Sequence, residues 1–156
     1  MAATEVQTVA GTKIGISAVA PATFDDAGYS ALTFSNIGEV TDGGSHGRVY
    51  AEVTHQPIDT RATRKFKGTF NEGTKTLQLA ISAADPGQVL LRAALLSDAP
   101  YSFKVMYQGG DIDYFQALVL SFEKAASGPD SILSATVQLS LTTSNTGVGI
   151  VEKLVV

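Results

Sequence analysis

The chain contains no cysteine, so it can form neither disulfide bonds nor zinc sites with thiolate ligands. No stretch approaches 18 uncharged apolar residues, which argues against a membrane-spanning helix. The first residues, MAATEVQTVAGTKIGIS, lack a basic start followed by a long apolar segment, so no secretory signal is expected. We therefore expect a protein made and used, or assembled, in a cytoplasm without contact with a membrane.

Charge is also sparse, because only 17% of the residues are charged while 44% are hydrophobic. A chain of 156 residues corresponds to about one domain and can bury a core without covalent cross-links. Sparse charge with many Thr, Ser, Ala and Gly residues is typical of a protein that covers its surface with copies of itself. It is equally typical of an ordinary Ala-rich sequence, and composition alone does not separate the two.

Residues that could perform catalysis are few and poorly spaced. His46 lies in a glycine-rich loop and His55 at a predicted strand end, and neither has metal-ligand spacing or an obvious nucleophile partner. Asp111-x-Asp113 lacks the rest of a calcium-binding loop. We therefore predict no enzyme activity, no metal site and no cofactor. Carboxylates far apart in sequence can still meet in a fold, so a small hydrolase or sugar-binding sandwich remains an alternative.

Alternation of apolar and polar residues predicts most of the secondary structure. In Ser134–Thr142 every second residue is apolar, which gives a strand with one buried face. Similar alternation predicts strands over residues 48–55, 65–70, 74–82, 101–107 and 113–123. The last of these is apolar on both faces, which indicates a strand covered on both sides. Its two predicted faces are Tyr114, Leu118, Leu120 and Phe122 on one side and Phe115, Ala117 and Val119 on the other.

One helix interrupts the strands. Asp85 can cap it, Pro86 suits the first helical position, and Gln88–Leu96 is apolar almost all round. Such a helix is expected to lie between a sheet and another layer. Asn71–Gly73 predicts a hairpin turn that joins strands 65–70 and 74–82. The predicted fold is mainly β, a single domain (residues 1–156) that forms a β-sandwich or partly closed barrel with one flanking α-helix.

The stretch RATRKFK, residues 61–67, holds four of the eleven basic residues in a chain of net charge −4. It follows residues 56–60 in what reads as a loop longer than a tight hairpin needs, and such loops are often functional. A plain solvated surface, a nucleic-acid site and a protein docking loop all fit this pattern. Against nucleic acid, the sequence pI is near 5.0 and the stretch offers only Phe66 for stacking on bases.

Several stretches in succession resemble the tail tube (major tail) proteins of long-tailed bacteriophages. The resemblance covers about residues 30–143, through the stretches GEVTD, VYAEVTH, RKFKGTF, GTKTLQL, DPGQVLLR and DSILSATVQL. It implies a β-sandwich or barrel with one flanking helix, and hexameric rings that stack into a hollow tube through which DNA passes during ejection. It implies no enzyme activity and no cofactor. The implied partners are copies of the chain and other tail proteins such as the tape measure, tip and terminator proteins, in a virion tail assembled in the host cytoplasm.

The resemblance also assigns contact residues. The loop 56–67 would match a projecting hairpin loop that contacts adjacent subunits and rings, through Gln56, Asp59, Arg61, Arg64, Lys65 and Lys67. Residues 1–13 and 143–156 would match terminal arms that reach neighbouring copies, through Val6, Val9, Ile150, Val151 and Leu154. A neutral or acidic lumen would let DNA slide, so an uncharged polar set is a candidate lining: Thr76, Gln78, Thr136, Gln138 and Ser140. The alternative function is a nucleic-acid-binding β-domain that uses Arg61–Lys67.

Overall fold

The computed structural model describes residues 6–155, which form mainly β-structure. The elements, in chain order, are β1 (Lys13–Ser17), α1 (Asp26–Ser30), β2 (Ser35–Asn36), β3 (Val40–Asp42), β4 (Val49–His55), β5 (Arg64–Asn71), β6 (Thr74–Ala80), α2 (Pro86–Leu95), β7 (Tyr101–Met106), β8 (Ile112–Ala125), β9 (Ser134–Thr142) and β10 (Val151–Lys153). Among these residues, neither helix is long and apolar enough to cross a membrane.

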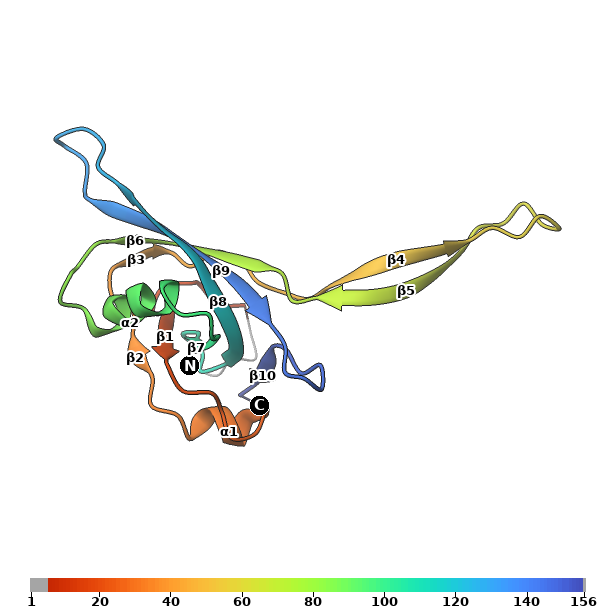
Figure 1. The fold of residues 1–156 in the computed structure, drawn as a ribbon, viewed down its shortest axis with the longest axis horizontal. Coiled ribbons are helices and arrows are strands. Elements are labelled where there is room, and N and C mark those ends of the chain that lie inside the picture. The colour runs from red at the N-terminus through yellow and green to blue at the C-terminus, as the bar shows by residue number, and fades with distance from the viewer. Residues whose placement is uncertain (1–5, 156) are drawn as a thin grey trace.

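The main sheet is antiparallel and has the strand order β2-β1-β7-β8-β9-β6-β3, with β10 paired to the first residues of β8. The sheet curls into a partly closed barrel, and α2 packs against one of its faces (Figure 1). The predicted fold class, a mainly β domain with one flanking helix, is confirmed. The sequence analysis missed the five-residue helix α1, the strand β1 and the short strands β2, β3 and β10.

The hydrophobic core lies on the face of the sheet that α2 covers. Alternate residues of β6, β7, β8 and β9 supply most of it, Ile14 and Ile16 of β1 add to it, and Leu91 and Ala94 of α2 close it. Gly87 allows this close packing, because a side chain there would collide with the backbone of Asn36 and Ile37. On the opposite face, Tyr29 of α1 stacks on Tyr114, so a second, smaller apolar contact covers part of β8.

Local chemistry sets the start of α2 as predicted. A carboxylate oxygen of Asp85 accepts hydrogen bonds from the amides of Gln88 (3.0 Å) and Gly38 (3.1 Å), so the cap also ties the helix to the strand region before β3. The prediction that α2 is covered on both sides is wrong within one chain. Val89 is 47% and Leu96 88% exposed on its outer surface.

A β-bulge changes the predicted faces of β8. Val119 pairs with Leu139, but Ser121 already pairs with Gln138, so Leu120 is an extra residue in β8. Leu120 is consequently 55% exposed, and Phe122 turns to pack against the core instead of sharing a face with Tyr114. The predicted assignment of Leu120 and Phe122 to one face with Tyr114 is therefore wrong.

The predicted hairpin at Asn71–Gly73 is also wrong. β5 pairs with β4 in a separate two-stranded sheet, whereas β6 pairs with β9 and β3 in the main sheet. The chain does turn here, since the Asn71 side chain accepts a hydrogen bond from the amide of Gly73. Between these residues, however, the side chain of Glu72 is buried in the body of the protein, so β5 and β6 run apart and do not fold back on each other.

Candidate assembly interface

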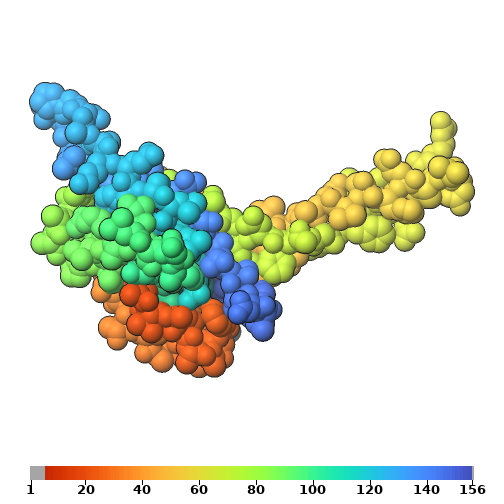
Figure 2. Space-filling view, in the orientation of Figure 1, coloured from red at the N-terminus to blue at the C-terminus, as the bar shows by residue number. Residues whose placement is uncertain are grey.

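The hairpin of β4 and β5, residues 48–71 and here called the ribbon, projects from the rest of the protein. Figure 2 shows it as a narrow arm with no layer packed on it. Every residue of β4 is exposed, and in β5 Gly68 alone is partly buried. A two-stranded hairpin without a core is marginally stable in water at best, so a partner surface would stabilise it.

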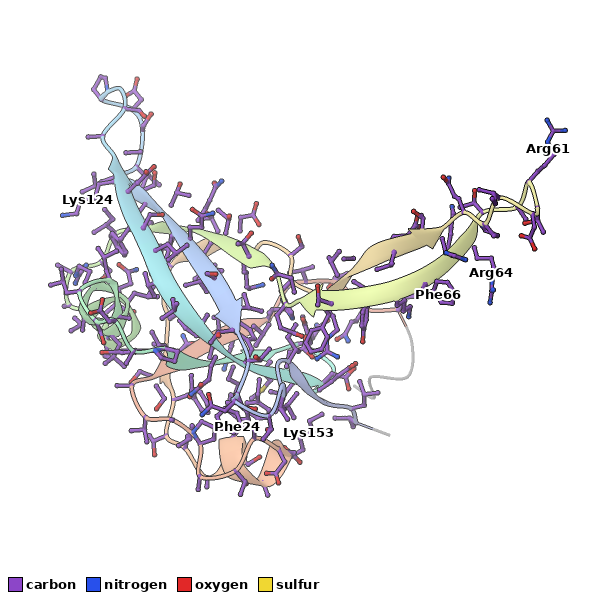
Figure 3. All side chains as sticks on the ribbon, turned by 45° about the vertical axis from the view of Figure 1, so that its right-hand side comes forward. Phe24, Arg61, Arg64, Phe66, Lys124 and Lys153 are labelled. Carbon is purple, nitrogen blue, oxygen red and sulfur yellow. The ribbon has the colours of Figure 1, made fainter. Side chains whose placement is uncertain are left out.

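The basic run lies along the far half of the ribbon. β5 begins at Arg64, so the loop is shorter than the predicted 56–67, and Arg64, Lys65 and Lys67 belong to the strand. Gln56, Asp59 and Arg61 remain in the connecting loop. Figure 3 shows Arg61 at the tip pointing away from the molecule, with Arg64 and Phe66 further back along β5.

Strand register divides the ribbon into two faces. Val53 pairs with Phe66 and His55 pairs with Arg64, so these four side chains lie on one face of the ribbon. Side chains alternate along a strand, so Ala51 and Val49 of β4 lie on the same face. Opposite Ala51, a bulge adds one residue to β5. On the other side of the bulge Tyr50 pairs with Phe70, so these two side chains again lie on the same face as each other. The apolar face, as we call it, consists of Val49, Ala51, Val53 and Phe66, with His55 and Arg64 at its far end.

The opposite face carries two lysines and two aromatic rings. We call it the basic face, and it consists of Tyr50, Glu52, Thr54, Lys65, Lys67 and Phe70. Lys67 Nζ lies 4.7 Å from the centre of the Tyr50 ring, and Lys65 Nζ lies 3.9 Å from Glu52 Oε1. The charges of the basic face are therefore partly matched within the ribbon itself.

Charge is distributed very unevenly between the ribbon and the body. Residues 48–71 hold five of the eleven basic residues and two of the fifteen acidic ones, a net charge of +3. Because the whole chain has a net charge of −4, the residues outside the ribbon together carry a net charge of −7. An isolated copy is thus a basic arm on an acidic body.

An ion pair between the partly exposed Arg48 and the buried Glu72 fixes the base of the ribbon. Arg48 Nε donates to Glu72 Oε1 at 2.6 Å, and the side chain of Glu72 is 1% exposed. The other oxygen of Glu72 accepts from the amide of Ile150 at 3.2 Å. Gly149 permits this approach, since any side chain there would collide with Glu72. The start of β4, the end of β5 and the C-terminal segment therefore meet at one carboxylate.

A second polar cluster holds the segment that leads into β4. His46 Nε2 contacts Asp113 Oδ2 at 2.8 Å, Lys75 Nζ lies 3.0 Å from His46 Nδ1, and the Tyr107 hydroxyl donates to Asp113 at 2.8 Å. The sequence analysis missed this cluster, because its members are far apart in the chain and follow no motif. It is a structural clamp in form, and the ring of His46 also packs against the core, with its centre 5.5 Å from that of Phe115.

The surroundings of this cluster shift the pKa values of three of its members, Lys75, Asp113 and Tyr107. Burial lowers the pKa of Lys75 to about 8, although the nearby carboxylates of Asp113 and Asp42 act in the opposite direction. Burial alone would raise the pKa of Asp113, but hydrogen bonds from His46 and Tyr107 outweigh it and hold that pKa below its usual value. Burial and the hydrogen bond to Asp113 raise the pKa of Tyr107.

Lys75→Met should reveal the cost of the buried amine as a pH-dependent difference in stability. Lys75 has a pKa of about 8 when folded and 10.5 when unfolded, so the unfolded chain binds more protons between these values and stability rises with pH there. From pH 7 to 9.5 the free energy of unfolding of the wild type should rise by about 2 kcal/mol relative to Lys75→Met. Urea denaturation of both proteins at each pH measures this. A difference that does not change with pH would contradict it.

The terminal segments occupy different surroundings. Val6 and Val9 are exposed, whereas residues 1–5 of the predicted N-terminal arm lie outside the described residues, and Lys13 already belongs to β1. In the C-terminal segment, Ile150 packs against the core of its own chain, and Val151 pairs with Tyr114 of β8. Leu154 is 57% exposed. The contacts seen for Ile150 and Val151 are thus intramolecular, and the predicted contacts with neighbouring copies stay a prediction for all five arm residues.

A family model described as lambda phage tail tube protein, TTP, matches residues 20–147. The chain belongs to the lambda phage tail tube protein family. Two solved structures share its fold. A chain of the anti-feeding prophage baseplate, determined by cryo-EM with six-fold symmetrisation, has a TM-score of 0.66 and 11% identity over 99% of both chains. The SPP1 tail tube protein has a TM-score of 0.64 and 14% identity, over 94% of this chain and 79% of that one. A search of curated proteins gave no match.

This membership identifies the protein as a structural subunit of a phage tail tube and confirms the resemblance found in the sequence. The alternative, a nucleic-acid-binding β-domain, gains no support from the comparisons. As a tail tube protein it is a virion component that assembles with copies of itself and with other tail proteins.

Proposed function

We propose that this tail tube protein forms homohexameric rings that stack into a hollow tube, and that the tube conducts DNA during ejection. The observation that carries this proposal is the ribbon, a long arm of exposed residues with no core beneath it. An arm of this kind gains stability only when another surface covers it. The six-fold symmetry named for the similar baseplate chain supports rings of six.

The contact we propose is head to tail. The ribbon of one copy would lie on the body of the next copy or ring, because its net charge of +3 faces a body of net charge −7. A heterologous contact of this type closes into a ring when its rotation fits a whole number of copies. The residues assigned to it are Gln56, Asp59 and Arg61 near the tip and Arg64, Lys65 and Lys67 on β5.

The terminal arms would add further contacts between copies. Val6, Val9 and Leu154 are exposed apolar side chains near the chain ends, so a neighbouring copy could cover them without rearrangement of the body. Ile150 and Val151 are partly buried in their own chain, and a neighbour would contact what remains exposed of them.

One surface of the main sheet suits the lining of a tube for DNA. On the face away from the core, β6 and β9 pair Thr76 with Gln138, and Gln78 with Thr136. Thr74 and Ser140 extend the same uncharged polar surface. A basic lumen would hold DNA through its phosphates by releasing counterions, whereas uncharged side chains allow it to slide. We therefore assign this surface to the lumen.

The remaining parts of the proposal concern partners and activity. The tube would meet the tape measure, tip and terminator proteins of the same tail, and it would be assembled in the host cytoplasm. DNA would pass through the lumen without specific binding, and the protein would catalyse no reaction. The structural role of the family supports this last point.

Electron microscopy of the purified protein, alone at high concentration and together with its tail initiation proteins, tests the proposal. We expect rings with six-fold top views and tubes built from them. Class averages with a different rotational symmetry would overturn the hexamer but keep the tube. A protein that stays monomeric even beside its tail partners would overturn the self-assembling tube itself.

A further inference from the structure

We propose that the apolar face of the ribbon, and not its basic face, is the surface that seats on a second copy of this chain. The inference rests on the proposed function, since it takes the ribbon as a docking element and adds which of its two faces makes the contact. Successive residues of a strand lie about 3.3 Å apart and point to opposite faces, so neighbouring positions of the ribbon serve as controls for each other.

The apolar face is a continuous strip without a cover. Val53 and Phe66 are directly opposite each other and are 49% and 48% exposed, and Val49 is 66% exposed. Gly68 keeps the strip flat, because a side chain there would press on Val53 and Ala51. Contiguous exposed apolar side chains rimmed by polar ones are typical of surfaces that bind another protein.

The basic face already has partners of its own. The Arg48 guanidinium lies 3.9 Å from the centre of the Phe70 ring, and Lys67 Nζ lies 4.7 Å from that of Tyr50. Burying this face against a protein would remove water from several cations that need it, which costs free energy unless new carboxylates replace the water. Seating the apolar face removes mostly apolar surface from water, and this is favourable.

Charge identifies the partner as another copy. The ribbon carries +3 and projects from a body that carries −7, so the body of a second copy attracts it. On the apolar face Arg64 stands beside Phe66, with its guanidinium 5.5 Å from the ring centre, at the rim of the strip. An apolar strip with a cation at its rim fits an acidic protein surface better than it fits DNA, which would approach the lysines of the basic face.

The absence of cysteine allows a direct test with single cysteine variants. Val53→Cys places a thiol on the apolar face, and Thr54→Cys places one on the basic face at the next residue. The rate of reaction with a maleimide is measured for both, first in the free protein and then in assembled tubes. We expect similar rates in the free protein. In tubes the Val53→Cys rate should fall by about tenfold or more while Thr54→Cys changes little, because interface cores exclude water.

Each other outcome has a separate meaning. Protection of Thr54→Cys alone, or of both positions equally, would overturn the inference but keep the ribbon as a docking element. Free reaction at both positions in well-formed tubes would show that neither face of the ribbon's strands is covered, which overturns the inference and restricts any docking to the loop at the tip. Ala51→Cys and Glu52→Cys, a second pair on the same two faces, repeat the test if Val53→Cys hinders assembly.

Discussion

Leu91→Asp should unfold the isolated protein. Leu91 is fully buried where α2 packs on the core face of the sheet. The substitution removes a leucine side chain from the core and puts a carboxylate with no cationic partner in its place. Loss of the leucine alone costs about 3 to 5 kcal/mol, and the buried carboxylate adds to this. Domains of this size are stable by only about 5 to 15 kcal/mol, so little or no folded protein should remain.

A substitution at the exposed C-cap of the same helix controls for the added negative charge. Leu96, at the end of α2, is 88% exposed, so Leu96→Asp should change the free energy of unfolding by about 0.5 kcal/mol or less. Circular dichroism with urea denaturation distinguishes the two variants. A cooperative transition of Leu91→Asp close to that of the wild type would show that the packing of α2 does not hold the fold together.

Reversal of two charges on β5 should block tube growth while the protein stays folded. Arg64 and Lys65 are exposed, and the ion pair of Lys65 with Glu52 joins side chains that are 65% and 61% exposed, so its loss costs little stability. Arg64→Glu with Lys65→Glu changes the ribbon from a net charge of +3 to −1, against a body of −7. Attraction between copies then becomes repulsion, and we expect tube growth to slow by about tenfold or more.

Sedimentation and electron microscopy measure this growth. Arg64→Lys with Lys65→Arg keeps both charges and should assemble like the wild type. Of the single reversals, Arg64→Glu should cause most of the defect, because Arg64 lies at the end of the apolar face and Lys65 on the basic face. Normal tubes from the double reversal would show that the basic run is not a docking element.

The parts of the fold set by neighbouring residues could be predicted from the sequence. The start of α2 depends on Asp85 and Pro86 alone, and alternation is enough to identify the core face of β6 and β9. The parts decided by distant contacts could not. Nothing near Leu120 signals the bulge, which arises from how β8 fits β9. Asn71–Gly73 has hairpin chemistry, but burial of Glu72 beneath Arg48 decides that β5 pairs elsewhere.

In the candidate site, too, local features could be predicted from the sequence and features that depend on distant contacts could not. The cluster of cations in residues 61–67 is visible in the sequence, and so is its place in a projecting hairpin once the family resemblance is used. The division into two faces is not visible, because it needs the pairing partner of each residue of β5. The clamp of His46 and Asp113 is equally hidden, since 67 residues separate the two side chains and no motif links them.

The ribbon is long and joins the body only at the end where Glu72 lies, so any change of its angle to the body is set near Glu72. A small rotation at this carboxylate becomes a large displacement of Arg61 at the tip. In a stack of rings such a displacement would be repeated at every level and would bend or twist the whole tube. The stiffness of one ion pair, whose buried carboxylate also accepts a hydrogen bond from the amide of Ile150, therefore bears on how straight the assembled tail can be.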